Sequence, residues 1–281
     1  MAVRSALINV MAAAAHKAAR GLIRDFGEVE QLQVSRKGTS DFVSEGDRRA
    51  ERVLRQELSK ARPRFGFLME EAGASEGADK DRRWIVDPLD GTTNFLHGLP
   101  HFSISIGYEQ EGEITAGVIY DPLRDEMFWA EKGVGAYVND HRLRVSGRTK
   151  LEEALFATGI PFGDRPGKEE FLEILRPMMQ QTAGVRRWGV ASLDLAYVAA
   201  GRFDGFWERG LSPWDIAAGL VLVREAGGFV TDFAGDHDNV LYGGDVVAGN
   251  ARLHETLLGI VRGGRAAPTA VKRAKLSVPR R

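Results

Sequence analysis

The segment Asp87 to Phe95 (DPLDGTTNF) constrains the fold of this 281-residue chain more than any other. Pro88 fixes φ and lacks a backbone N–H, so we expect a strand to end here and Asp87 and Asp90 to turn toward a common point. Gly91 permits close approach of the backbone, and the N–H groups of a helix that opens there would form an anion cradle. The segment therefore indicates a cation and an anion bound side by side, although the same residues also suit an ordinary Asx turn.

A second acid pair, Glu70 and Glu71, follows the apolar run Phe65 to Met69. Trp84 to Asp87 is another short strand candidate that stops at a carboxylate. Two strands that end in acids are typical of a site built at strand ends. The alternative interpretation of Glu70 and Glu71 is a pair of solvated surface acids.

Asp215 stands at the start of a predicted helix, Pro213 to Ala226, and has two interpretations. With Ser212 as the N-cap and Pro213 at the first helical position, Asp215 would complete a capping box and serve stability alone. Alternatively, Asp215 is one more carboxylate of the same cation site. Asp47, which opens another predicted helix, is either a charge at a helix N-terminus or a part of that site.

Composition restricts which metals the chain can bind. It has no cysteine, which excludes disulfides and thiolate metal sites, and its six histidines show no paired ligand spacing. Residues 263–281 hold six basic side chains and no acid, so the rest of the chain carries a formal charge of −7 within a total of −1. An acidic body repels anionic substrates unless cations intervene, so we expect phosphate to bind through a metal.

The N-terminal residues 2–26 are predicted to form an amphipathic helix, with a second helix over residues 47–61. His16, Lys17 and Arg20 interrupt the first apolar run well short of a membrane span, so we expect no membrane segment and a cytoplasmic protein.

Alternating apolar and polar residues between 102 and 143 predict antiparallel hairpins, which makes the first half rich in strands. The second half alternates helices with strands. The sequence thus predicts a mixed α/β fold of layered sheets and helices, with one catalytic domain over residues 1–262. Residues 263–281 are predicted to be a basic, disordered tail.

Together these segments resemble the inositol monophosphatase family, lithium-sensitive phosphatases of sugar and polyol phosphates that use Mg²⁺. The family signature is an acid pair, then Asp-Pro-(Ile/Leu)-Asp-Gly-Thr, then a distant Trp-Asp. The matches here are Glu70-Glu71, Asp87 to Thr92 and Trp214-Asp215, in that order and spacing. Further matches are Asp41 to Asp47 (DFVSEGD), Lys132 to Asn139 (KGVGAYVN) and Phe206 to Gly210 (FWERG). The resemblance covers residues from about 5 to 262 and implies the sugar-phosphatase fold.

The resemblance also implies a set of metal ligands. They are the side chains of Glu70, Asp87, Asp90 and Asp215, with the backbone carbonyl of Leu89. Glu71 and Asp47 are implied to support these ligands or a weaker metal position. Mg²⁺ prefers such oxygen donors, and two ions can activate an attacking water and stabilise the leaving oxygen.

Catalytic and substrate roles follow from the same resemblance. Glu70 and Thr92, with Asp90, are the implied catalytic residues, and the first two would orient the attacking water. The backbone N–H groups of Gly91 and Thr92 would hold phosphate oxygens. The implied polyol contacts are Ala191, Glu208, Asp90 and Asp215. Lys37 is the implied lysine of a mobile loop, with Arg36 as the alternative register.

The expected substrate is inositol monophosphate or a related small sugar or polyol phosphate, and Thr93 to Phe95 (TNF) favours the inositol type. Val190 departs from the Ser or Thr usual in the family and is expected to alter polyol contacts near Ala191. Histidinol-phosphate, fructose-bisphosphate and nucleotide phosphatases of the same superfamily remain alternatives. The family usually forms homodimers. Some bacterial relatives bind the transcription machinery, and the tail over residues 263–281 would then contact RNA or an acidic protein.

Overall fold

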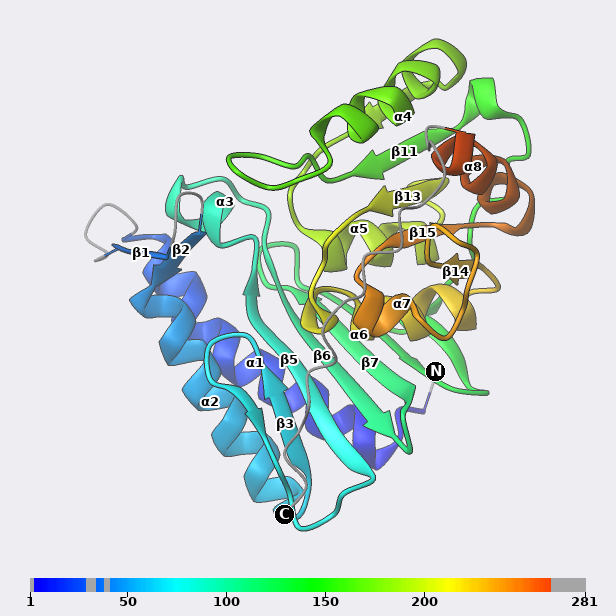
Figure 1. Ribbon diagram of the computed structural model, residues 1–281. Coiled ribbons are helices and arrows are strands. Elements are labelled where there is room, and N and C mark those ends of the chain that lie inside the picture. Colours follow the sequence, from blue (N-terminus) through cyan, green and yellow to red (C-terminus); the bar gives the residue numbers. More distant parts are fainter. Residues whose placement is uncertain (1–2, 29–33, 38–40, 264–281) are drawn as a thin grey trace, which may run out of the picture.

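The computed structural model describes residues 3–28, 34–37 and 41–263 and stacks helices and sheets in five alternating layers (Figure 1). The first layer is α1 (Ala6–Phe26) and α2 (Glu45–Ala61), the middle layer is α5 (Ala191–Ala199) and α6 (Pro213–Glu225), and the last is α4 (Lys168–Gln181) and α8 (Ala251–Gly263). A sheet separates each pair of helical layers. The predicted layered α/β fold is confirmed.

The larger sheet has eight strands in the order β10-β9-β8-β7-β6-β5-β3-β4. Their bounds are β3 Gly66–Met69, β4 Gly73–Ser75, β5 Arg82–Asp90, β6 Ser103–Gln110, β7 Glu113–Asp121, β8 Glu126–Glu131, β9 Gly135–Val138 and β10 His141–Arg142. The predicted antiparallel hairpins from β6 to β10 are confirmed. Within this sheet β3 and β5 alone run parallel. Outside it, β1 (Val34–Lys37) and β2 (Asp41–Ser44) form a separate ribbon.

The smaller sheet has five strands in the order β12-β11-β13-β15-β14. Their bounds are β11 Leu155–Thr158, β12 Gly184–Arg186, β13 Gly205–Glu208, β14 Phe229–Thr231 and β15 Val246–Gly249. Short elements complete the described chain: α3 (Thr92–Leu96), α7 (Val240–Gly243) and a 3₁₀ turn at Leu151–Glu153. Of the predicted tail, residues 264–281 lie outside the described residues, and Gly263 ends α8.

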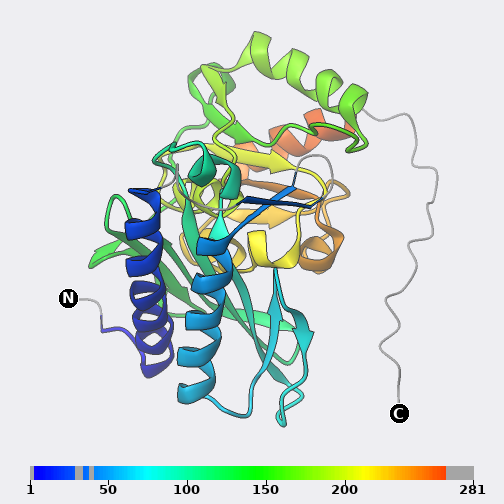
Figure 2. The same cartoon turned by 90° about the vertical axis from the view of Figure 1, so that its left-hand side faces the viewer.

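Burial patterns explain which helices occupy which layer. Helix α1 buries one face against the larger sheet, and Figure 2 shows it beside α2 on the outside of that sheet. Helix α6 is buried all round from Ile216 to Val223, because it lies between two sheets and has no solvent face. Among the described residues, no helix combines the length and apolar character needed to cross a membrane.

The prediction that Pro88 ends its strand is wrong, because β5 continues to Asp90. The pairing of β5 with β6 shifts register between Asp87 and Asp90, so Pro88 occupies an irregularity where no ladder hydrogen bond needs its missing N–H. The register shift lies between Asp87 and Asp90 and interrupts the regular alternation there.

The middle helical layer packs closely on the larger sheet through two glycines. A Cβ atom at Gly107 would lie 2.7 Å from Cβ of Ala217. One at Gly117 would lie 2.8 Å from Cα of Ala218 and 2.8 Å from Cγ1 of Val221. Side chains at these glycines would therefore push α6 away from the sheet.

We predict that Gly117→Ala lowers the free energy of unfolding by about 1–3 kcal/mol, because the added methyl group overpacks the contact with α6. The matched control is Gly259→Ala in α8, where a Cβ meets nothing within 4 Å. That control should gain up to ~1 kcal/mol from helix propensity. Urea denaturation of both variants tests this, and equal effects of the two changes would refute the packing argument.

Candidate metal and phosphate site

The parallel pair β3 and β5 brings the first acids together. Met69 lies opposite Val86 in this pair, and the Glu70 N–H donates to the Val86 carbonyl at 3.3 Å. Because the strands are parallel, Glu70 and Asp87 emerge at the same edge of the sheet. The two acids therefore lie on neighbouring strands, with Glu70 just past the end of β3 and Asp87 within β5.

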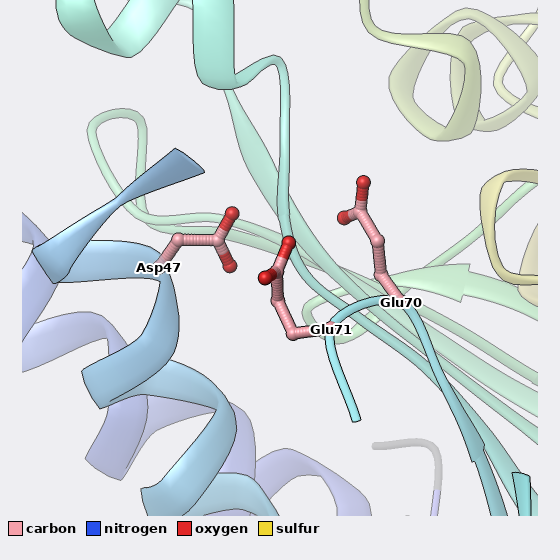
Figure 3. Close-up of side chains that lie close together, drawn as sticks. All are labelled: Asp47, Glu70 and Glu71. Carbon is pink, nitrogen blue, oxygen red and sulfur yellow. The ribbon is translucent and has the colours of Figure 1, made fainter. Parts of the chain in front are cut away.

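Three carboxylates form the tightest cluster in this region. Ligand oxygens of Asp47, Glu70 and Glu71 lie within 4.8 Å of one another, the one such group found in the described part of the chain. Figure 3 shows Asp47, from the first turn of α2, facing Glu71, with Glu70 beside them. Clustered carboxylate oxygens suit a hard cation, so this group can hold a metal. The sequence had assigned Asp47 and Glu71 only supporting roles.

Glu51 holds this cluster in place and was missed in the sequence. It lies one helical turn after Asp47 and is buried. Its Oε2 accepts the backbone N–H of Glu71 at 2.9 Å and of Ala72 at 3.4 Å. The i, i+4 spacing of Asp47 and Glu51, which puts both acids on one face of α2, is the signal that could have revealed it.

Asp87 is a buried acid near these residues. Burial raises its pKa well above the usual value, and repulsion from Glu70, Asp90 and Asp215 raises it further. Its Oδ1 accepts the N–H of Leu89 at 2.9 Å, which closes a turn around the proline. The mutual repulsion shows that the four predicted acids share one electrostatic environment, although they do not form so tight a group as the cluster around Glu71.

Asp90 joins the two halves of the chain. Its Oδ2 accepts the backbone N–H of Ser192 at 2.8 Å, in the first turn of α5. Burial raises the pKa of Asp90 to about 6, and the hydrogen bonds from Ser192 partly oppose this shift. Ala191, a predicted substrate contact, opens the same helix and is thereby placed beside Asp90.

The backbone after Asp90 turns as predicted. Gly91 has φ of 97°, and a Cβ there would lie 2.8 Å from Cγ2 of Val190. The Thr92 hydroxyl donates to the carbonyl of Leu89 at 3.0 Å, so it points toward the predicted carbonyl ligand. Val190, the departure from the family pattern, therefore packs a methyl group against the predicted anion cradle.

Asp215 forms the predicted capping box and lies in the electrostatic environment of the other acids. The capping box is formed, with the Ser212 N–H donating to Asp215 Oδ2 at 2.7 Å. Burial and repulsion from Asp90 raise the pKa of Asp215 to about 8, while the hydrogen bond from Ser212 lowers it. Ser105 on β6 donates to the Trp214 carbonyl at 3.2 Å and ties this helix start to the larger sheet.

Glu208 ends β13 on the other side of the site. Burial raises its pKa to about 7, opposed by Arg187 and reinforced by Asp90. A Cβ at Gly159 would lie 1.8 Å from Glu208 Oε1, so the carboxylate rests directly on that glycine. Asp194, with a pKa raised by burial and by Glu208, is a further buried acid that the sequence did not reveal.

The side chains of Arg36 and Lys37, the candidates for the mobile-loop cation, lie outside the described residues. Their backbone forms β1.

Comparison with known proteins agrees with this geometry. The model of the inositol monophosphatase family matches residues 4–265. An inositol-1-monophosphatase of Mesorhizobium japonicum is 60% identical over 259 residues, covering 92% of this chain and 97% of the relative. A Nus factor SuhB of Pseudomonas aeruginosa is 47% identical over 256 residues, covering 90% and 94%. The crystal structure of the extragenic suppressor protein suhB from Bartonella henselae has a TM-score of 0.90 at 54% identity, covering 93% of this chain and 100% of that one.

The layered fold, the clustered acids and these matches define a phosphatase. The chain belongs to the inositol monophosphatase family, whose members depend on a metal. The predicted family and enzyme class, a phosphoric monoester hydrolase, are confirmed.

We predict that the metal-free protein loses stability as pH rises from about 4 to 8, and that Asp215→Asn weakens this loss. The folded-state pKa of Asp215, about 8, exceeds the ordinary 3.8, so the folded state holds its proton more tightly and ionisation opposes folding. At pH 8 in chelator, the variant should be more stable than the parent by about 2–4 kcal/mol.

The control is Ser212→Ala, which should cost about 0.5–2 kcal/mol at every pH because it removes a cap and no charge. Urea denaturation at pH 5 and pH 8 measures both effects. Parallel pH profiles for the parent and Asp215→Asn would contradict the electrostatic role.

Proposed function

We propose that the chain hydrolyses inositol monophosphate, or a related small sugar or polyol phosphate, with Mg²⁺ as cofactor. The observation that carries the proposal is the carboxylate cluster of Asp47, Glu70 and Glu71, at the start of α2 and the end of β3, with oxygen donors only. The turn at Gly91 follows the acids of β5. The close relative from Mesorhizobium japonicum, named inositol-1-monophosphatase, supports the substrate. One catalytic unit over residues 1–262, a homodimeric state and a cytoplasmic location belong to the same proposal.

The proposed metal ligands are those expected from the sequence: the carboxylates of Glu70, Asp87, Asp90 and Asp215, and the carbonyl of Leu89. Asp47 and Glu71 add negative charge and a further metal position. Bound Mg²⁺ would supply Lewis acidity to the phosphate and lower the pKa of a coordinated water, and a second ion would stabilise the leaving oxygen.

The protein groups position the reacting molecules. Glu70 and Thr92 orient the attacking water, with Asp90 as the third catalytic residue, while the N–H groups of Gly91 and Thr92 hold the phosphate. The Thr92 hydroxyl, held on the Leu89 carbonyl, supports this role.

The polyol is held on the opposite side of the phosphate. We assign its hydroxyls to Glu208, Asp215 and the backbone at Ala191. A carboxyl with a pKa of about 7, such as Glu208, can both donate and accept a hydrogen bond near neutral pH.

Phosphate release should be highest with inositol 1-phosphate in a panel that also contains fructose 1,6-bisphosphate, histidinol phosphate and 3′-phosphoadenosine 5′-phosphate. All turnover should stop in excess EDTA and return with Mg²⁺, because the site offers oxygen donors and no side-chain nucleophile. Mg²⁺ should also raise the melting temperature, since it binds only the folded site. Full turnover in EDTA after metal removal would overturn the mechanism, and a preference for another panel member would move the substrate to an alternative branch.

Millimolar Li⁺ should inhibit turnover at modest Mg²⁺, because a small cation competes for the weaker metal position among Asp47, Glu70 and Glu71. The matched measurement replaces Li⁺ with K⁺ at equal ionic strength. Unchanged turnover at tens of millimolar Li⁺ would argue against this competition while leaving phosphatase activity in place.

A second function as a partner of the transcription machinery is favoured by one observation. The relative from Pseudomonas aeruginosa, named Nus factor SuhB, is 47% identical to this chain over 256 residues. The basic segment that the sequence offered for RNA contact lies, except for Gly263, outside the described residues. The phosphatase function therefore has the stronger structural support.

A further inference from the structure

A cavity of about 360 Å³ opens beside Glu208, between α4, the end of β13 and the loop that follows β11. Its volume falls in the range of about 300–1,000 Å³ found for small-molecule sites. Glu208 lines the cavity, whereas Glu70, Asp87 and Asp90 do not. The cavity thus adjoins the proposed polyol position and is separate from the metal cluster.

Trp207 and Arg209 form part of the cavity wall. The indole Nε1 of Trp207 and the Nε of Arg209 have no hydrogen-bond partner, but both atoms are buried behind the wall and do not face the cavity. Trp207 is only 1% exposed, so its contribution to the wall is its apolar ring surface.

The remaining walls are apolar and the charges are balanced. Phe171, Ile174 and Phe233 supply apolar surface. Arg209 is held by an ion pair with Glu170 at 3.1 Å and by contact of its guanidinium with the Phe233 ring at 4.7 Å. Its charge is therefore already matched.

The other charged groups lead to the same conclusion. Arg165 lines the cavity together with Glu208 and Asp245, so this part of the wall has no excess of positive charge. A second phosphate would meet carboxylates without a surplus of cations, which disfavours it. A neutral group with hydroxyl oxygens and an apolar face suits these walls better.

We propose that this cavity is a second substrate subsite, which binds a neutral, hydroxyl-bearing extension of the phosphorylated alcohol, such as the second ring of a disaccharide phosphate. The inference rests on the proposed function, because the phosphate end of that substrate would lie at the metal cluster. It assigns Phe171 and Phe233 to contact with the apolar face of that extension. It makes the wall at α4 the determinant of substrate length.

The test compares glucose 6-phosphate with trehalose 6-phosphate, which share the phosphorylated ring and differ by one neutral glucose. The parent should favour trehalose 6-phosphate in kcat/KM by about tenfold, equivalent to ~1.4 kcal/mol of added binding. Glu170→Trp, at an exposed cavity position in the first turn of α4, should remove that preference and leave glucose 6-phosphate unaffected. The matched control is Glu169→Trp, which lies next to it outside the cavity wall and should change neither substrate.

Three results would overturn the inference. They are equal kcat/KM for the two sugar phosphates in the parent, an equal fall for both in Glu170→Trp, or a preference of tenfold or more for fructose 1,6-bisphosphate over fructose 1-phosphate. Calorimetric titration of the Mg²⁺-loaded protein with the neutral sugars trehalose and glucose, which carry no phosphate to be hydrolysed, should show tighter binding of trehalose. That titration separates the two claims: failure to hydrolyse any of the phosphates refutes the proposed function, and equal binding refutes the subsite.

Discussion

The structure depends on holding several carboxylates of like charge in a place largely removed from water. Burial is the first cause of the raised pKa of Asp87, Asp90 and Asp215, and repulsion from neighbouring acids is a further cause for Asp87 and Asp215. Such a group opposes folding at neutral pH unless a proton or a cation compensates it. The metal dependence of the family therefore has a basis in folding energetics as well as in chemistry.

Strand pairing and helix starts bring these carboxylates together. In an antiparallel pair, successive strand ends lie at opposite edges of the sheet, and the parallel pairing of β3 with β5 is what places Glu70 beside Asp87. The second half contributes helix starts, since Asp90 bonds to the first turn of α5 and Asp215 lies in the first turn of α6. The positive ends of both helix dipoles partly offset the negative charge. Close packing of α6 on glycines of the larger sheet fixes these helix starts.

The sequence was informative wherever the signal was local. Helix periodicity, the hairpins and the turn at Gly91 could be predicted because neighbours in the chain determine them. The short strands β11 to β13 could not, since each has three or four residues and is defined by pairing with distant partners. The support of Glu71 by Glu51, and of Glu208 by Gly159, likewise depends on tertiary approach. The resemblance to a family supplied the acid set, but not which acids lie closest together.

The capping box at Asp215 is compatible with the metal role that we propose for this residue. Three of the proposed ligands each accept one hydrogen bond from a backbone N–H group. Asp87 accepts the N–H of Leu89, Asp90 accepts that of Ser192, and Asp215 accepts that of Ser212. A carboxylate has about four lone-pair sites, so one backbone N–H fixes its orientation and leaves capacity for a cation. Fixing the proposed ligands before a cation arrives would lower the ordering cost of binding. The capping box, which could explain Asp215 by helix stability alone, thus also fixes the orientation of the Asp215 carboxylate.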